Sequence, residues 1–510
     1  MCVGAPLLSG AESRARDRDA IERLHIPGIV LMENAGRGAG AAILKSHSTH
    51  LQRVVVLCGP GQNGGDGYVV ARHLFCAGVV PTCILVGASE AIQGDALPNF
   101  RAVEALGIPV LHSEQPEQVG EALSCLEEAT LIVDGLFGTG LSRPIEGDPR
   151  RLVECVNQCE VPVISLDMPS GVSADTGREL GVGIRATRTL TFGARKMGLL
   201  QYPGAELAGA IEVVPLGAPS PGSATGRLID EAWMSARLQP RRLDSHKGVH
   251  GHVYVIGGGP TTTGAAILAA MGAMRAGAGL VTIAAPQGGV HELQSELVEV
   301  MSDVIPEGME ALDGFLENIG RRASSVVCGP GLGFSEGVRR LVPQLASQLE
   351  IPVVLDADAL TIIAEDAGVE MLQSARGPRV LTPHPGEAAR LLGISSSEVQ
   401  ADRYEASRAL AERSGQTCIL KGAGTIVRQG AEILVSDRGT PALAVAGTGD
   451  VLAGAIGGLL HRLSALEAAA AAVFLHARAG KLASRCDRGL LAREVASGLP
   501  NAMAEVFSAR

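Results

Sequence analysis

The chain has 510 residues, of which 46% are hydrophobic and only 3% are aromatic, and its formal net charge at pH 7 is −11. This length exceeds what one hydrophobic core accommodates, so we expect two domains. The acidic balance and the scarcity of aromatic side chains argue against nucleic-acid and anionic-membrane partners, which need clustered Lys/Arg and stacking platforms.

The first half of the chain alternates helical stretches with short apolar runs. Residues 13–47 are predicted to be helical, with a break at Pro27 and Gly28. Helices such as 67–77 and 99–106 separate the apolar runs that follow. The predicted strands are 54–58, 82–86, 131–133, 163–166 and 189–192. Strands that alternate with helices indicate βαβ units and a parallel sheet.

Residues 217–226 lack charge and periodicity, and their glycines, prolines and serines predict a linker. Beyond it the alternation restarts and ends in a pair of alanine-rich helices at about 450–487. The predicted strands are 253–256, 280–284, 325–328, 353–355, 380–381, 417–420 and 432–435. We therefore predict an α/β protein with domains at 1–219 and 228–510, a linker at 220–227 and no mutual repeat between the halves.

A glycine-rich stretch, residues 59–67, follows the first predicted strand and opens a helix. It matches GxGxxG, which is typical of dinucleotide-binding turns. The acidic residue expected about 20 residues later has only Glu90 as a loose candidate, which speaks against a simple NAD-dependent dehydrogenase. The glycines also fit a tight turn without a ligand.

Two further loops begin where predicted strands end, at Asp134 and at Asp167. In open α/β sheets ligands bind at this edge. Asn63, Asp134 and Ser170 offer only oxygens, which suits a hard cation. The 138–140 turn together with Arg143 suits a phosphate. Either aspartate could instead cap a helix.

These stretches resemble the signatures of the NAD(P)HX epimerases at 31–36, 63–67, 134–144 and 167–171, in the same order. That family has a Rossmann-like fold and interconverts the R and S hydrates of damaged NADH or NADPH. The resemblance implies potassium at Asn63, Asp134 and Ser170, and a proton shuttle at Asp167 with Lys196 as its partner, although a solvated surface lysine is the usual case. The implied hydrate-binding residues are Gln62, Asn63, Gly64, Gly65, Asp66, Gly138, Thr139, Gly140, Leu141, Ser142, Arg143, Pro144 and Asp167.

In the second half, the Gly-Thr-Gly-Asp string at 447–450 precedes a helical run at 451–460. Unpaired amides at a helix start attract phosphate oxygens. A carboxylate there can accept a proton from a hydroxyl that attacks phosphorus. The alternative is that Asp450 only caps the helix. No GxxxxGK[ST] string exists in the chain, which excludes a P-loop.

Other polar stretches also follow predicted strands of this half. Residues 421–425 place a lysine and a glycine turn after one strand, suited to phosphate or ribose. His384 lies between two prolines, and this stiff loop orients its ring for binding. The alternative is a structural histidine whose ring hydrogen-bonds to the backbone. Asp356 and Asp358 follow another strand, and the glycines of 329–333 leave backbone room for a bulky ligand.

This constellation resembles the ribokinase-like superfamily and, more narrowly, the NAD(P)HX dehydratases, through 263–270, 275–280, 382–387, 421–425 and 447–450. The resemblance implies dehydration of the S hydrate driven by ADP or ATP, with Asp450 as the base and magnesium between the phosphates. The implied hydrate contacts are Ala265, Gly331, Gly333, His384 and Asp450. The implied ADP contacts are Lys421, Gly422, Ala423, Gly424, Thr425 and Gly449.

One alternative is a vitamin-precursor kinase of the same superfamily fused to a non-catalytic dinucleotide-binding module. The joint presence of Asp134, Asp167 and Ser170 favours the bifunctional repair enzyme. Ten scattered cysteines without CxxC spacing, no apolar run near the roughly 18 residues of a membrane span and no signal peptide predict a cytoplasmic protein. Expected partners are small-molecule substrates and further copies of the chain, with no nucleic acid and no membrane.

Overall fold

The computed structural model describes residues 4–113, 115–219, 224–288 and 298–508. It divides into two compact units, Pro6–Gly226 and Arg227–Arg510, the latter with the residues up to Ala5. Part of the expected linker, 220–223, lies outside the described residues. None of the helices in the described ranges is long and apolar enough to cross a membrane.

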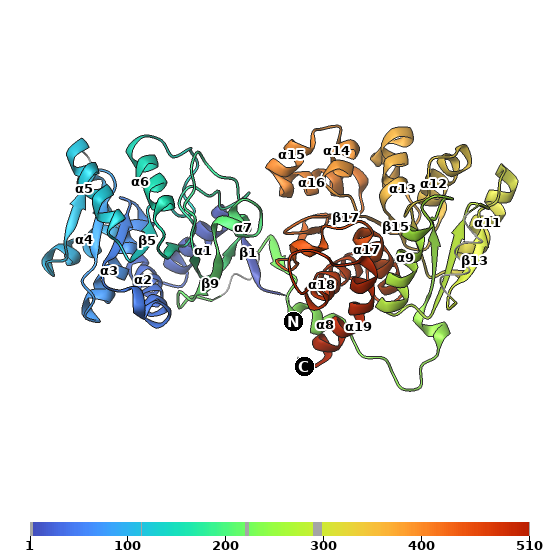
Figure 1. The fold of residues 1–510 in the computed structure, drawn as a ribbon, viewed down its shortest axis with the longest axis horizontal. Helices are drawn as coiled ribbons and strands as arrows, with labels where there is room; N and C mark the ends of the chain where they lie inside the picture. The colour runs from blue at the N-terminus through green and yellow to red at the C-terminus, as the bar shows by residue number, and fades with distance from the viewer. Residues whose placement is uncertain (1–3, 114, 220–223, 289–297, 509–510) are drawn as a thin grey trace. The chain divides into compact units, whose positions relative to one another are not determined.

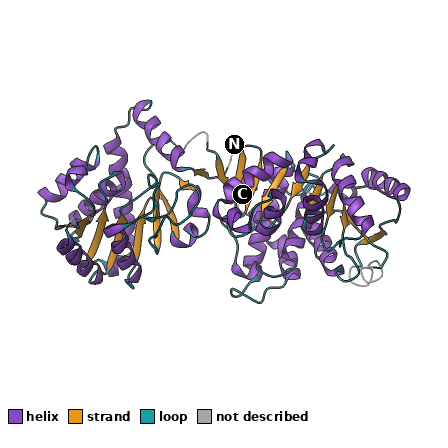
Figure 2. Cartoon of the chain, turned by 90° about the horizontal axis from the view of Figure 1, so that it is seen from above, coloured by secondary structure: helices purple, strands orange, loops and turns teal. Residues whose placement is uncertain are grey.

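The N-terminal unit contains a seven-stranded, fully parallel sheet in the order β4-β3-β2-β5-β6-β7-β9. Helices α2, α3 and α4 bury one face of this sheet, and α5 and α6 bury the other. The blue-to-green part of Figure 1 and the cartoon of Figure 2 show this helix–sheet–helix layering, which is Rossmann-like. The bounds are β2 Val54–Cys58, β3 Thr82–Leu85, β4 Val110–His112, β5 Leu131–Gly135, β6 Val163–Leu166, β7 Arg188–Phe192, β9 Ala210–Val214, α2 Gly28–Ser46, α3 Gln62–Cys76, α4 Ala96–Ala105, α5 Pro116–Glu127 and α6 Gly147–Gln158.

Two short strands, a short helix and the first long helix complete the N-terminal unit. Strand β1 (Pro6–Leu8) pairs in parallel with β8 (Arg195–Lys196), and helix α1 (Gly10–Glu22) follows β1. Ser9 and Glu12 form a capping box that starts α1. Helix α7 spans Gly204–Leu207. Helix α1 corresponds to the predicted helical stretch before the break at Pro27 and Gly28, whereas β1, β8 and α7 were not predicted.

The glycine-rich stretch after β2 differs from the prediction, because α3 begins at Gln62 rather than at Gly67. Asn63 and Asp66 therefore lie in its first turns instead of in a preceding loop. A side chain at Gly64 would place its Cβ only 1.8 Å from the carbonyl oxygen of Gly59, so the glycine allows the strand–helix turn to close tightly.

The C-terminal unit contains a sheet in the order β13-β12-β11-β14-β15-β16-β17-β18-β19. The strands are parallel from β13 to β17, whereas β17, β18 and β19 pair antiparallel, which the sequence analysis did not predict. Strand β10 (Gly226–Leu228) lies at the boundary of the units. The other bounds are β11 His252–Ile256, β12 Leu280–Ala285, β13 Met301–Val304, β14 Ser325–Cys328, β15 Val353–Leu355, β16 Arg379–Leu381, β17 Thr417–Leu420, β18 Ile426–Gln429 and β19 Glu432–Val435.

Helices cover both faces of this sheet in the green-to-red part of the chain (Figures 1 and 2). They are α8 Glu231–Arg237, α9 Thr263–Ala276, α11 Met309–Arg322, α12 Glu336–Gln348, α13 Ala357–Ile362, α14 Pro385–Leu392, α15 Ser396–Ala401, α16 Arg403–Ser414, α17 Thr448–Leu459, α18 Ala465–Ala483 and α19 Ala492–Ser508. Helices α9 and α17 touch backbone to backbone, because a Cβ at Gly454 would lie 1.8 Å from the carbonyl oxygen of Ala269. Their small residues join α18 and α19 in the main core.

Candidate functional site

A cavity of about 710 Å³ lies in the N-terminal unit. Residues that follow β2, β5 and β6 line it, together with helices α1 and α2. The sheet order reverses between β2 and β5, and this reversal is the usual ligand position in open α/β sheets. Its polar and charged lining comprises Ser13, Arg14, Asp17, Arg18, Gln62, Asn63, Asp66, Asp95, Thr139, Ser142, Arg143, Asp167 and Lys196.

Asp167 and Lys196 form a buried ion pair at the cavity wall. The Lys196 ammonium also donates to the Thr191 hydroxyl (3.1 Å) and to the Phe192 carbonyl (3.0 Å), so it is fully partnered and not a surface lysine. Asp167 has a left-handed backbone (φ 65°), and its Oδ1 accepts from Lys196 and from the Phe192 amide. Its Oδ2 lies 3.5 Å from where a Cβ would stand at Gly138, a residue of the cavity wall.

Asp134 is fully buried at the end of β5. Its carboxylate accepts from the Ser165 hydroxyl (2.7 Å), the Ser170 hydroxyl (2.5 Å) and the Ser170 amide (2.9 Å). Burial raises the pKa of Asp134, while these hydrogen bonds oppose that rise. The aspartate thus fastens the Ser170 loop to the strand end and does not cap a helix.

Asn63 is buried beside the cavity, and neither its side-chain oxygen nor its nitrogen has a hydrogen-bond partner within the described residues. An orphaned buried amide of this kind is rare in folded proteins. Its Oδ1 lies 3.3 Å from a Cβ position at Gly138. Within the described part of the chain, no three His, Cys, Asp or Glu side chains could hold a metal ion. A cation here would therefore rest on amide, hydroxyl and carbonyl oxygens with a single carboxylate.

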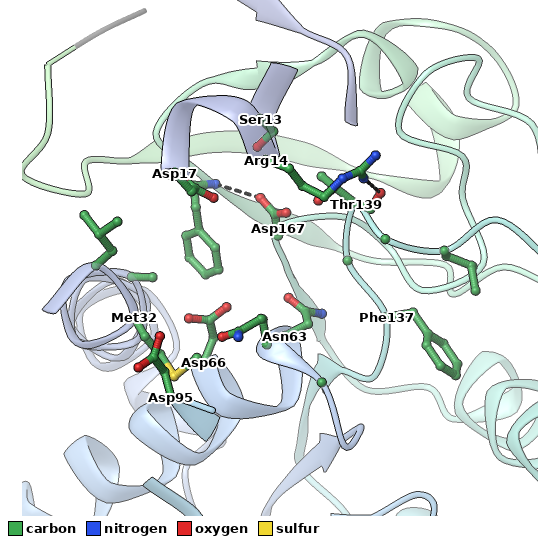
Figure 3. Close-up of a pocket in the computed structure, with 18 of the residues that line it drawn as sticks. Ser13, Arg14, Asp17, Met32, Asn63, Asp66, Asp95, Phe137, Thr139 and Asp167 are labelled. Carbon is green, nitrogen blue, oxygen red and sulfur yellow. Dashed lines mark hydrogen bonds between the residues drawn. The ribbon is translucent and has the colours of Figure 1, made fainter. Parts of the chain in front are cut away.

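Besides Asp167, the carboxyl groups of Asp66 on α3, Asp17 on α1 and Asp95 line the cavity (Figure 3). Burial first and the negative charge of Asp167 second raise the pKa of Asp66 well above its usual range. Burial is also the main cause that raises the pKa of Asp17. The sequence analysis missed Asp17, because it stands in a charged run that resembles an ordinary solvated helix.

Most of the predicted hydrate-binding residues line the cavity. They are Gln62, Asn63, Asp66, Gly138, Thr139, Gly140, Leu141, Ser142, Arg143 and Asp167. Gly64, Gly65 and Pro144 are not among the lining residues. Close packing explains why glycine stands at both positions 64 and 65. A Cβ at Gly64 would collide with the Gly59 carbonyl, and a Cβ at Gly65 would lie 2.6 Å from the Met32 methyl carbon.

In the C-terminal unit, Lys421 at the end of β17 is held by two carboxylates. Its ammonium lies 2.8 Å from Asp356 Oδ1 and 3.8 Å from Glu387 Oε2. The Thr382 hydroxyl donates to the same Asp356 oxygen (2.7 Å). Burial lowers the pKa of Lys421, but the two carboxylates outweigh it and the net shift is upward. The sequence analysis noted Asp356 at a strand end but did not foresee this pairing.

Asp450 lies in the first turn of α17, next to this ion pair. The helix is capped by Gly447, whose φ of 91° favours glycine, and Asp450 makes no capping hydrogen bond in the described structure. A Cβ at Gly449 would lie 3.5 Å from the Lys421 ammonium, so the amides of the 447–450 turn adjoin that cation. Burial first and the charge of Asp356 second raise the pKa of Asp450 to about 7.

Ala265, Gly331 and Gly333 gather beside these charges. A Cβ at Gly331 would lie 3.0 Å from the Cβ of Ala265, and the Gly333 amide donates to Asp358 Oδ2 (2.8 Å). The charge of Asp358 also acts on Asp450. The loops after β14 and β15 and the N-terminal turns of α9 and α17 therefore converge.

His384 caps a helix, and its contact with the hydrate stays a prediction. Its Nδ1 accepts from the Gly386 amide (3.0 Å) and caps α14, and Glu387 closes the capping box by accepting from the His384 amide (2.7 Å). The other ring nitrogen lies 3.6 Å from Glu387 Oε1 on a half-exposed side chain. The cap orients the ring and leaves this nitrogen at the surface.

Ala423, Gly424 and Thr425 form the turn between β17 and β18, in which Gly422 (φ 131°) and Gly424 (φ 65°) have left-handed backbones. The Thr425 hydroxyl donates to the Gly422 carbonyl (2.6 Å) and closes the turn. The Arg403 guanidinium donates to the carbonyls of Leu420 and Lys421, just before the turn. This fixed glycine turn next to Lys421 offers backbone groups to a phosphate or a ribose.

Comparison with known proteins covers both units. Residues 253–501 match the family model described as NAD(P)H-hydrate dehydratase, and residues 28–198 match the model described as YjeF-related protein N-terminus. A bifunctional NAD(P)H-hydrate repair enzyme from Moorella thermoacetica is 38% identical over 97% of this chain and 96% of its own length. The enzyme of the same name from Escherichia coli K12 is 36% identical over 95% of this chain and 92% of its own length.

The fold comparison concerns the C-terminal unit. The crystal structure of a ribokinase-like superfamily protein from Enterococcus faecalis V583 is 25% identical to this chain, with a TM-score of 0.50. The match covers 56% of this chain and 99% of that protein. The C-terminal unit is therefore ribokinase-like.

Proposed function

The chain belongs to the family of bifunctional NAD(P)H-hydrate repair enzymes, and on this premise we propose which side chains carry each half of the repair. The protein is an enzyme that combines an epimerase with a dehydratase of hydrated NADH and NADPH. The vitamin-kinase alternative is not favoured, since the dehydratase model spans 253–501 and near-full-length relatives carry the repair name. We assign epimerisation to Pro6–Gly226 and dehydration to Arg227–Arg510.

For dehydration, Asp450 is proposed as the general base. Hydroxide is a poor leaving group, so phosphorylation of the 6-hydroxyl of the S hydrate turns the oxygen into a phosphate leaving group. The lone pair of the ring nitrogen then expels phosphate, and loss of a proton from C5 restores the 5,6 double bond and the lone pair. The carboxylate of Asp450 would take the hydroxyl proton. Its pKa near 7 matches this task, because a base works best when its pKa lies near the working pH. This coincidence of position and pKa carries the assignment.

The nucleotide is proposed to bind with its phosphates between Lys421 and the amides of the 447–450 turn. A helix start and an adjacent ammonium both attract phosphate oxygens. The glycine turn 422–425 would contact the rest of the ADP or ATP, and Ala265, Gly331, Gly333 and His384 the hydrate. Magnesium bound to the phosphates would neutralise their charge. Asp356 and Glu387 hold Lys421 in place for this contact.

For epimerisation, the proposed proton carrier is Asp167. Lys196 and the Phe192 amide fix its Oδ1, which leaves Oδ2 for a substrate in the cavity. The lining residues from 62–66 and 138–143 would hold the hydrated dinucleotide, with Arg143 near a phosphate. A homo-oligomer and a cytoplasmic location stay predictions.

One experiment tests the division of labour in the full chain. Supplied with R hydrate alone and no nucleotide, the protein is expected to form S hydrate until the two epimers equilibrate, without absorbance of reduced nicotinamide. Addition of ADP and magnesium should then convert the whole pool to NADH or NADPH. Reduced nicotinamide that forms from either epimer without nucleotide would contradict the proposal.

Potassium is proposed for the Asn63, Asp134 and Ser170 region. The donor set fits a large monovalent cation, because it holds only oxygens with one carboxylate and because the Asn63 amide has no hydrogen-bond partner among the described residues. Replacement of potassium by choline is expected to lower the epimerisation rate and to spare dehydration of the S hydrate. Equal epimerisation rates in the two salts at one ionic strength would remove potassium from the proposal.

A further inference from the structure

Inversion at a hydroxylated carbon needs a second proton-transferring group besides Asp167. The hydroxyl must leave from one face of the ring and a water must add to the opposite face, so an acid is needed for the first step and a base for the second. Asp167 forms an ion pair with Lys196, and its Oδ2 is left toward the cavity, which suits the base. The missing acid is a neutral group that faces the same cavity. This argument rests on the epimerase role proposed above.

Asp17 meets this description. Its side chain reaches the cavity from α1, while Asp167 reaches it from the end of β6 (Figure 3). The Asp17 carboxyl makes no hydrogen bond within the described residues and no ion pair closer than 4 Å, unlike Asp19, which pairs with Arg23 on the same helix. Helix α1 also lies before the range that the N-terminal family model matches, 28–198.

The charged groups around Asp17 act on its pKa in both directions. Burial raises its pKa most, the charge of Asp167 raises it further, and the charges of Arg16 and Lys196 oppose this. The same cavity is also lined by the guanidinium groups of Arg14, Arg18 and Arg143 and by the carboxyl groups of Asp66 and Asp95. Arg14 donates to the Thr139 carbonyl (2.9 Å) and Lys196 to Asp167, so neither is committed to Asp17.

Asp66 is the competing candidate, but it is less suited to release a proton. It is almost completely buried, and its pKa lies well above the usual range, mainly because of that burial. This burial also limits the access of solvent, which has to return the proton of a general acid after each turnover. Asp17 is half-buried, so solvent can restore its proton between turnovers.

We propose that Asp17 is a further catalytic residue, the general acid of the epimerase. Its proton passes to the 6-hydroxyl, the carbon–oxygen bond breaks and water departs, while the lone pair of the ring nitrogen forms a carbon–nitrogen double bond. A water molecule then bonds to this carbon from the opposite face and gives a proton to Asp167 Oδ2, and the nitrogen regains its lone pair. One proton has moved from Asp17 to Asp167, and solvent returns it.

The test uses the full chain with Asp17→Asn, and with Asp19→Asn as the matched control on the exposed side of the same helix. Asp17→Asn is expected to slow epimerisation by a factor of about 10²–10⁴, the usual contribution of one acid or base. Dehydration of S hydrate with ADP should be unchanged in both variants. Asp17→Glu, which keeps the carboxyl group, should recover part of the rate, and thermal unfolding checks the fold.

Oxygen exchange tests the step itself. In H₂¹⁸O, each inversion catalysed by the parent protein should place one solvent oxygen on the hydrate, which mass spectrometry detects. Retention of the original oxygen, a normal rate in Asp17→Asn, or a loss confined to Asp66→Asn would each overturn the assignment. A parent protein that does not epimerise at all would instead refute the proposed function, so the two failures are distinguishable.

Discussion

Replacement of Asp450 by Asn is expected to lower the rate of ADP-driven dehydration by a factor of about 10²–10⁴, because the amide accepts no proton from the 6-hydroxyl. Binding of ADP should stay within a few-fold, since Lys421 and backbone amides are proposed to hold the phosphates. The rate follows from the absorbance of reduced nicotinamide, and ADP binding from calorimetry. Asp313→Asn, an exposed aspartate on α11, is the matched control.

The pH dependence of dehydration and of stability tests the role of Asp450 independently. With a pKa of about 7, the Asp450 base is ionised above that pH, so the dehydration rate of the parent protein should fall about tenfold per pH unit below it. Because the folded-state pKa exceeds the ordinary value of 3.8, the stability that Asp450 contributes is present below pH 4 and is lost as the pH rises through 7. Asp450→Asn should therefore unfold at an equal or higher temperature than the parent at pH 8. Near-normal turnover in such a folded variant would refute the role of Asp450.

Replacement of Asp167 by Asn is expected both to abolish epimerisation and to destabilise the N-terminal unit. The change removes the proposed base and leaves the Lys196 ammonium buried without its counterion. Removal of one partner from a buried pair costs about 3–5 kcal/mol of the free energy of unfolding. Denaturant unfolding measures this loss, and Asp148→Asn on the exposed face of α6 is the control.

The double variant Asp167→Asn/Lys196→Met separates stability from chemistry. It removes both charges, so most of the lost free energy of unfolding should return, while the epimerisation rate should stay at background. Dehydration of S hydrate should persist in all of these variants. A double variant that epimerises at the parent rate would show that the buried pair only supports the fold.

The strands could be predicted well from the sequence, because buried parallel strands are short apolar runs between turn residues. Val54–Cys58, Val163–Leu166 and Ser325–Cys328 have the predicted bounds. The start of α3 was misjudged, since glycines near a helix start are indistinguishable from a turn until the contact between Gly64 and Gly59 is seen. Strand β18 was not predicted at all, and its antiparallel pairing depends on tertiary packing.

Residues of the candidate sites could be singled out from the sequence only where they follow a predicted strand or begin a predicted helix. Asp134, Asp167, Lys421 and Asp450 were found because each stands at such an end or at a helix start. Asp17 was missed, since a carboxylate among arginines on a helix looks solvated, and only the fold turns that face toward the cavity. The sequence left a backbone-bonded His384 open as an alternative; the hydrogen bonds of its ring show the helix cap, and its contact with the hydrate stays a prediction.

The close contact of α9 and α17 bears on the order in which the C-terminal unit folds. Helix α17 contains four glycines in twelve residues, and each glycine disfavours a helix by about 1 kcal/mol relative to alanine. The isolated segment would therefore not persist as a helix, and it becomes helical only when it docks on α9. Asp450 reaches its position only when α17 packs on α9. A folding intermediate without this helix pair therefore lacks the proposed catalytic base.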